Sequence, residues 1–268
     1  MKTPRTAIRI AAIRLLCPDP GKTATFYAAA FGATVAPDGS RLALGAQTIE
    51  LAPAADRGAG FAPANGTDFQ HCALVVADME AAYAHLRGVP GWTPISRAGP
   101  ERLPASSGGV SAFKFRDPDG HPLELLAFPP GAVPPLWRDR PGLFLGIDHT
   151  AITVADTERA VAFYAGLGFT VASQGVNHGP EQARLDALHA PVVEVTCLTP
   201  PGGAPPHLEL LCYRTPGSIS RTCADGSPLA TRLVFAGSGD SSTPLRDPDG
   251  HRLLMASGTF RSAALHEP

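Results

Sequence analysis

Two repeated phrases constrain the fold of this chain more than any other feature. Arg116–Leu125 (RDPDGHPLEL) returns near the C-terminus as Arg246–Met255 (RDPDGHRLLM). A second phrase, Gln70–Asp78 (QHCALVVAD), matches Asp148–Asp156 (DHTAITVAD), with His and Asp at the same spacing in both. A fainter copy, Ala12–Asp19 (AIRLLCPD), keeps the spacing to Asp but has Ala at the His position. Such internal repeats indicate a chain built from copies of one structural unit.

The composition allows one large or two ordinary hydrophobic cores, since 44% of the 268 residues are hydrophobic and 17% are charged. The formal net charge is −2 and no basic or acidic block occurs, so we expect no binding to nucleic acid or to a membrane. Residues 1–16 lack the continuous apolar run of a signal peptide or membrane span. The 5 cysteines form no CxxC pair, which favours reduced thiols and a cytoplasmic location.

A Pro-rich, aperiodic segment divides the chain into halves. We therefore predict an N-terminal domain over 1–128, a linker over 129–146 and a C-terminal domain over 147–268. Each half contains two units of strand, helix and further strands, although the fourth unit, 231–247, has room for one strand and no helix. The predicted strands are 8–16, 47–52, 71–77, 110–115, 122–128, 149–155, 169–176, 192–198 and 207–213. The predicted helices are 20–31, one capped by Asp78 and ending near Arg87, and 157–167 after its N-cap Asp156.

Strand alternation predicts which side chains can meet. If Ile152 and Val154 lie under the helix of their unit, His149 faces the other way, and the same count puts Glu209 on that opposite face. His71 and Glu124 are related in the same way in the second unit. An imidazole and a carboxylate on neighbouring strands form half of a divalent-metal site, and two such halves facing each other would complete it.

This pattern resembles the vicinal oxygen chelate superfamily, which includes glyoxalase I, extradiol dioxygenases, methylmalonyl-CoA epimerase and the fosfomycin- and bleomycin-resistance proteins. The resemblance rests on the His-x6-Asp phrases, the Phe26-Tyr27 and Phe163-Tyr164 pairs, the Asp-Pro-Asp-Gly turns and the strand-borne glutamates. It implies an α+β fold in which tandem βαβββ modules form two glyoxalase-like domains, here with the fourth module truncated. It also implies a metal held by first-strand His (or Gln) and last-strand Glu residues and chelated by two substrate oxygens.

The units differ in how many metal-binding residue types they have at the ligand positions that the resemblance implies. Unit one offers Ala12 and Glu50, unit two His71 and Glu124, unit three His149 and Glu209, and unit four Thr231 or Arg232 with Leu254. Pairing units two and three gives two His and two Glu, whereas pairing one with two, or three with four, leaves an incomplete set. We therefore favour the pairing of two with three. In unit one, an ion pair between Arg14 and Glu50 could replace the metal.

The resemblance implies a divalent metal ion, with Fe, Mn, Ni, Zn and Co all open, at His71, Glu124, His149 and Glu209. The expected function is a glyoxalase-type lyase or isomerase that acts on a small oxygen-rich metabolite through a metal-stabilised oxyanion, with Glu124 or Glu209 as catalytic base. One alternative is an extradiol-type ring-cleaving dioxygenase with Fe or Mn, which needs two His and one carboxylate. Another is a non-catalytic small-molecule binding or resistance protein. We expect a monomer or homodimer.

Other residues have an ordinary structural explanation beside the functional one. A histidine within a strand is usually a core residue, but matched histidines, each with its own Glu, favour a metal site. His178, in the polar stretch 177–181, is a candidate substrate contact if that stretch forms a lid, and otherwise it belongs to a loop. Tyr213 and Arg214 are candidate contacts to an acidic substrate, or they cover a sheet edge. His121 and His251 follow turn glycines, and we assign them to the hairpins.

Overall fold

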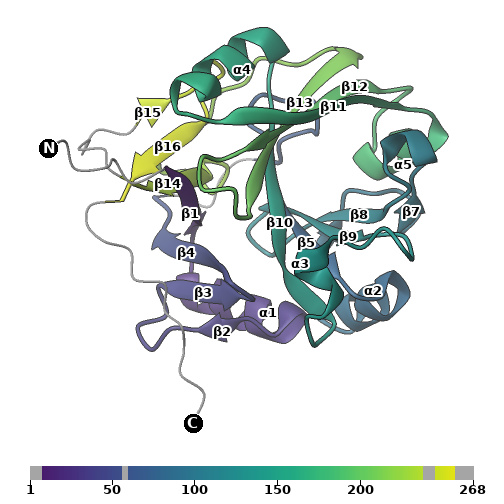
Figure 1. Cartoon of the computed structure of the whole chain (residues 1–268). Helices are drawn as coiled ribbons and strands as arrows, with labels where there is room; N and C mark the ends of the chain where they lie inside the picture. Colours follow the sequence, from purple (N-terminus) through teal and green to yellow (C-terminus); the bar gives the residue numbers. More distant parts are fainter. Residues whose placement is uncertain (1–7, 56–59, 238–244, 257–268) are drawn as a thin grey trace, which may run out of the picture.

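The computed structural model of the chain describes residues 8–55, 60–237 and 245–256. Within these residues the α+β fold of repeated strand–helix–strand units is confirmed, and the strands form two sheets. Figure 1 shows that the first unit (purple) lies side by side with the last (yellow), while the two middle units share the other sheet. Each sheet therefore joins one unit from each half of the sequence. The domain boundaries at residues 128 and 147 stay a prediction.

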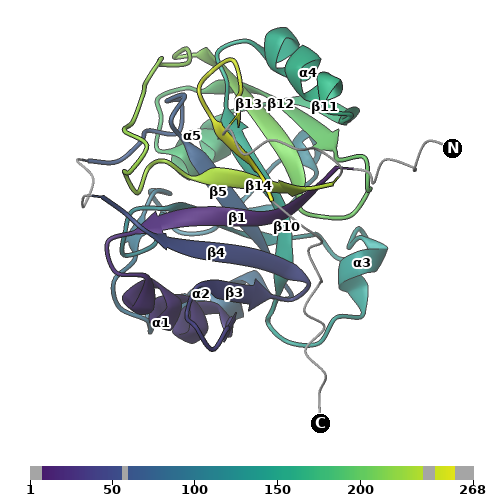
Figure 2. The same cartoon turned by 90° about the vertical axis from the view of Figure 1, so that its left-hand side faces the viewer.

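The seven-stranded sheet combines units one and four. Unit one contains β1 (Arg9–Cys17), α1 (Pro20–Phe31), β2 (Thr34–Val35), β3 (Arg41–Leu44) and β4 (Gln47–Pro53). Unit four contains β14 (Arg232–Ala236), β15 (Leu245–Arg246) and β16 (Arg252–Met255). The strand order is β15-β16-β14-β1-β4-β3-β2, with β1 antiparallel to β14, as Figure 2 shows in its centre. Most of the predicted connection of unit four lies at 238–244, outside the described residues.

The nine-stranded sheet combines units two and three. Unit two contains β5 (Gln70–Val76), α2 (Met79–Arg87), β6 (Thr93–Pro94), β7 (Glu101–Arg102), a 3₁₀ turn (Ala105–Ser107), β8 (Ser111–Arg116) and β9 (Pro122–Ala127). Unit three contains β10 (Phe144–Thr153), α4 (Thr157–Gly166), β11 (Thr170–His178), α5 (Pro180–Asp186), β12 (Val192–Thr199) and β13 (His207–Thr215). The order is β11-β12-β13-β10-β5-β9-β8-β6, with β7 on β8. The pairing of β5 with β10 is the pairing of units two and three that the sequence favoured.

The caps of the three long helices follow from their sequences. Asp19, Asp78 and Asp156 each adopt an extended backbone and accept a hydrogen bond from a first-turn N–H group. Gly32 ends α1 in the left-handed conformation that glycine adopts without steric cost. The helices pack on one face of each sheet, where alternate strand residues such as Ile152 and Leu210 form the main apolar core with them.

The repeated Asp-Pro-Asp-Gly-His turns tie consecutive units together. Tyr27 donates a hydrogen bond to Asp117 (3.2 Å), and Tyr164 donates the equivalent bond to Asp247 (3.1 Å). His251 donates from Nε2 to the carbonyl of Thr153 (2.8 Å). The turn histidines are therefore part of the hairpins, in agreement with the sequence interpretation.

Two short helices interrupt segments for which the sequence predicts loops. The first, α3 (Pro135–Arg138), lies in the linker, and its Trp137 is buried against Val75 and Leu145. The second, α5, follows β11 and contacts the edge of unit two through a bidentate ion pair of Arg184 with Glu101 (2.7 Å for each bond). Among the described helices, none has both the length and the apolar character needed to cross a membrane.

Candidate metal centre

The face of the nine-stranded sheet opposite α2 and α4 bears a cavity of about 550 Å³. All four predicted ligands, His71, Glu124, His149 and Glu209, line it. Strand alternation explains their position, because the neighbouring residues of the same strands point into the apolar core beneath the helices. The two middle units thus direct their imidazoles and carboxylates into one shared space.

His71 and Glu124 form the contribution of unit two. Ala73 pairs with Glu124 across β5 and β9, so the side chains of His71 and Glu124 leave the sheet on the same face. His71 Nε2 lies 2.8 Å from Glu124 Oε2, and both residues are buried. Despite this distance, neither ring nitrogen of His71 has a hydrogen-bond partner. Apart from this misaligned contact with Glu124 the imidazole has no partner, and a bound cation would offset the desolvation cost of one of its nitrogens.

His149 and Glu209 form the contribution of unit three, with the same register between β10 and β13. His149 Nε2 lies 3.5 Å from Glu209 Oε2. On the other side of the ring, Nδ1 lies 3.1 Å from Asp148 Oδ2, and Asp148 also accepts a hydrogen bond from Trp137 Nε1 (3.1 Å). A carboxylate on one imidazole nitrogen fixes the ring and leaves the other nitrogen for a metal.

The two contributions meet where β5 and β10 run antiparallel. The ring centroids of His71 and His149 are 5.7 Å apart. Ligand atoms of His71, Glu124 and His149 all lie within 4.8 Å of one another. Atoms bound at about 2.1 Å to one cation lie about 3 Å apart at right angles and about 4.2 Å apart on opposite sides. These three side chains are therefore candidate ligands of one cation, whereas Glu209, 3.5 Å from His149 Nε2, lies outside this group.

Charge in the cavity is set by the same side chains. Burial lowers the pKa of His71, although the Glu124 carboxylate opposes this shift. For His149 burial also favours the neutral ring, but the Glu209 carboxylate and other anions prevail and raise its pKa to about 9. Burial acts to raise the pKa of Glu209, whereas His149 and other groups lower it to about 2. Ionised carboxylates beside imidazoles are a donor set that suits Zn, Fe, Mn, Ni and Co.

Comparison with known proteins identifies the family of the chain. A sequence profile of the Glyoxalase/Bleomycin resistance protein/Dioxygenase superfamily matches residues 9–125 and 146–255. The chain belongs to this superfamily. Its two matched segments correspond to the two glyoxalase-like halves, and the vicinal oxygen chelate resemblance is confirmed. A search of curated proteins finds no match.

Solved structures of other proteins are similar to this chain at low sequence identity. Glyoxalase I from Zea mays is 16% identical and similar over 93% of this chain and 92% of its own chain, with a TM-score of 0.58. A putative dioxygenase from Bacillus subtilis subsp. subtilis str. 168 is 14% identical over 86% of this chain and 71% of its own, with a TM-score of 0.45. The superfamily contains metalloenzymes with different reactions, so the fold alone does not give the reaction.

The seven-stranded sheet of this superfamily member lacks the ligand set at the corresponding positions. Ala12, Arg232 and Leu254 occupy positions that hold His or Glu in the other sheet. Glu50 remains, and Arg14 Nη2 lies 2.7 Å from its Oε2. The ion pair expected from the sequence is confirmed, and Arg14 provides the positive charge that a buried carboxylate requires.

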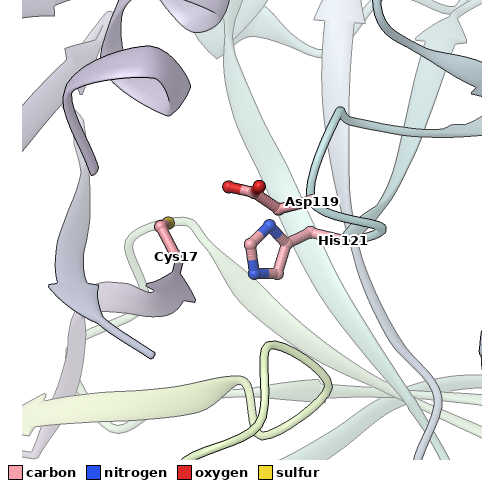
Figure 3. A group of neighbouring side chains, drawn as sticks. All are labelled: Cys17, Asp119 and His121. Atoms are coloured by element: carbon pink, nitrogen blue, oxygen red, sulfur yellow. The ribbon is translucent and has the colours of Figure 1, made fainter. Parts of the chain in front are cut away.

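Another group of metal-binding residue types brings Cys17, at the end of β1, to Asp119 and His121 of the turn between β8 and β9 (Figure 3). Its histidine has partners at both ring nitrogens: Nδ1 lies 2.8 Å from Asp117, and Nε2 donates to the carbonyl of Leu16 (3.0 Å). Burial raises the pKa of the Cys17 thiol to about 12, which disfavours the thiolate that binds metals. We therefore assign these residues to the stability of the turn and not to metal binding.

The three predicted substrate contacts, Tyr213, Arg214 and His178, lie in three different places, and only Tyr213 lines the cavity. Tyr213 lines the cavity and donates a hydrogen bond to Asp186 (2.9 Å). Arg214, the next residue, points to the other face of β13 and forms a bidentate ion pair with Glu194 (2.8 and 2.7 Å), so it does not line the cavity. His178 lines a separate hollow of about 480 Å³ beside α5.

Sequence reasoning missed a polar cluster in the cavity wall. Lys114 pairs with Asp186 (2.7 Å), and Gln182 donates to the same carboxylate (2.6 Å). All three side chains are buried, and the Oε1 atom of Gln182 has no hydrogen-bond partner. The sequence did contain one signal for this cluster: Lys114 is a charged residue within the strand 111–116, and it pairs with Glu124 on the next strand. Asp186 gave none, because α5 was expected to be a loop.

Proposed function

We propose that this chain is a divalent-metal-dependent enzyme, a glyoxalase-type lyase or isomerase that acts on a small oxygen-rich metabolite. One observation supports this proposal above the others: two His and two Glu from two different units line a single cavity. The buried ring of His71 adds to it, because the one nitrogen of a neutral imidazole that has a free lone pair is available to a metal there.

His71, Glu124, His149 and Glu209 would hold the metal. A bound divalent cation supplies Lewis-acid polarisation of a carbonyl oxygen. The side chains of the protein do the rest: they orient the substrate, exclude water and move a proton between neighbouring carbon atoms. An ionised carboxylate at the site can accept the proton from carbon next to the carbonyl and return it to the adjacent position.

Glu124 is the better candidate for this base. Both oxygens of Glu209 face imidazoles, since Oε2 lies 3.5 Å from His149 Nε2 and Oε1 lies 3.6 Å from His207 Nε2. Within the described residues, only Oε2 of Glu124 takes part in an ion pair. Its other oxygen is therefore better able to meet a substrate proton.

The cavity wall favours a small polar substrate. Beside its apolar side chains, the wall includes the neutral polar residues Ser106, Ser107, Ser173, Gln174, Asn177 and Gln182. The unpartnered Oε1 of Gln182 offers an acceptor to a substrate hydroxyl or N–H group. The cytoplasmic location and the monomeric or homodimeric state stay predictions.

The test is exchange of carbon-bound hydrogen. The metal-loaded protein is incubated in D₂O with a panel of small 2-hydroxyaldehydes and 2-hydroxyketones, and deuterium next to the carbonyl is followed by NMR. We expect exchange with at least one member, and a loss of about 10²- to 10⁴-fold in Glu124→Gln. His178→Ala, outside the cavity, is the matched control. Absence of exchange from every compound would reject the isomerase.

A ring-cleaving dioxygenase is the second candidate, and one observation favours it. His71, Glu124 and His149 form a compact group of two imidazoles and one carboxylate, the set found in non-haem Fe(II) oxygenases. Oxygen uptake by the Fe(II)-loaded protein with simple catechols, absent without the catechol, would support this activity. If neither exchange nor oxygen uptake occurs, the non-catalytic binding protein becomes the better explanation.

A further inference from the structure

The carboxylate of Glu209 faces two different imidazoles with its two oxygens. Oε2 lies 3.5 Å from His149 Nε2, and Oε1 lies 3.6 Å from His207 Nε2. The second separation is longer than a hydrogen bond. It is close to the distance of about 3.4 Å between two ligand atoms bound to one tetrahedral cation at about 2.1 Å. His207 is therefore placed against Oε1 of Glu209 much as His149 is placed against Oε2, and each imidazole could share a cation with this carboxylate. We call the group around His207 the outer group.

A thiol completes this outer group. Ligand atoms of Cys197, His207 and Glu209 all lie within 4.8 Å of one another. They come from adjacent strands, because Cys197 of β12 pairs with Glu209 of β13, and His207 lies two residues before Glu209 on the same face. Three ligand types converge on one point from two rigid strands, which is the arrangement that a metal site requires.

The outer group is also reachable from solvent. The side chains of His207 and Glu209 are 23% and 21% exposed, and Cys197 is half-buried. All three line the main cavity, while Cys197 and His207 also line a neighbouring hollow of about 180 Å³. A cation can enter from that hollow without passing His71.

The local charge suits a second cation. Asp148 Oδ2 lies 3.6 Å from His207 Nε2, so that imidazole faces one carboxylate from its own strand and one from β10. Cys197 adds one more negative charge when its proton is released on metal binding. Two cations bridged by a carboxylate are a common arrangement in metalloenzymes.

We propose that Cys197, His207 and Glu209 form a second divalent-cation site, which shares the Glu209 carboxylate with the centre at His71, Glu124 and His149. A ligand set of one thiolate, one imidazole and one carboxylate selects a borderline-soft ion such as Zn²⁺ or Co²⁺. Three protein ligands leave a fourth tetrahedral position open to water or substrate.

Cobalt titration tests the site, because a Co²⁺–thiolate bond gives a near-ultraviolet charge-transfer band that imidazole and carboxylate ligands do not give. The metal-free protein is titrated with Co²⁺ in the presence of a phosphine reductant. We expect two equivalents to bind, with the band present. Cys197→Ser and His207→Ala should each bind one equivalent fewer, and Cys197→Ser should lose the band entirely.

Two further variants separate this site from the first one. Cys223→Ser, which changes another half-buried thiol, should keep both ions and the band. His71→Ala should lose one equivalent and keep the band, even if the proposed enzyme activity fails its own test. The proposal is overturned if the wild-type protein shows no charge-transfer band with excess Co²⁺. It is equally overturned if the band survives in Cys197→Ser.

Discussion

His71 Nε2 lies 2.8 Å from Glu124 Oε2 in the wall of the cavity, yet His71 forms no hydrogen bond. Leaving a buried polar group without a partner costs about 1–3 kcal/mol. The two atoms are close enough to share a ligand and are poorly oriented to bond each other. This relationship is the clearest sign that the two side chains are arranged for a third participant.

The buried ion pair of Lys114 and Asp186 should be the most sensitive polar contact of the cavity wall. Lys114→Met leaves a buried carboxylate without its cation and should destabilise the metal-free protein by about 3–5 kcal/mol. The double variant Lys114→Met/Asp186→Leu should recover part of this loss, because no buried charge then remains unpaired. Urea unfolding measures both values.

The exposed pair of Lys22 and Asp19 is the matched control for that experiment. Solvent screens its charges, so Lys22→Met should leave the unfolding midpoint unchanged. If Lys114→Met lowers the free energy of unfolding no more than Lys22→Met does, the role given to the buried pair is contradicted.

The ion pair of Arg184 with Glu101 should hold α5 against unit two. Because Glu101 is buried while Arg184 reaches solvent, Arg184→Ala should release α5 locally rather than unfold the whole chain. We expect faster amide hydrogen exchange at residues 180–187 and unchanged exchange in β5 and β10. Arg214→Ala removes a similar bidentate pair, with Glu194, that does not involve α5, and it should leave exchange at 180–187 unaltered. Equal effects from both variants would contradict this account.

His121 should make stability depend on pH. Burial lowers its pKa, but Asp117 and the Leu16 carbonyl accept from both ring nitrogens, and the net pKa is raised above 6.5. Its stabilising contribution is therefore complete below pH 6.5 and lost as pH rises through the raised value. Urea unfolding at several pH values measures the free energy of unfolding of wild type and of His121→Gln. The difference between the two free energies should shrink as the solution becomes alkaline. A difference that grows with pH would show that the sign is wrong.

Most of the fold followed from the sequence because its signals are local and repeated. Helix α1 begins and ends where Pro20 and Gly32 indicate, and β10 presents His149 to the face that alternation predicted. The pairing of units two and three followed from counting ligands, since only that pairing brings two His and two Glu together.

The parts that escaped prediction depend on contacts distant in sequence. Nothing around Asp186 indicates that it meets Lys114, and α5 is too short to show helical periodicity, although Pro180 at its first turn was a usable signal. His207 lies two residues before Glu209, so strand alternation places the two on one face, but Cys197 joins them only through the register of β12 with β13. From the sequence, Tyr213 and Arg214 were both candidate substrate contacts. Adjacent residues of a strand face opposite sides, so only one of the two can point into the cavity.

The most direct test of the central claim is elemental analysis of the purified protein beside His71→Ala and His149→Ala. These residues belong to different units, so one shared centre predicts that either change alone lowers the metal content by one ion per chain. His178→Ala, whose imidazole lies outside the cavity, should retain the wild-type content. Wild-type metal content in either His71→Ala or His149→Ala would contradict a centre shared by the two units.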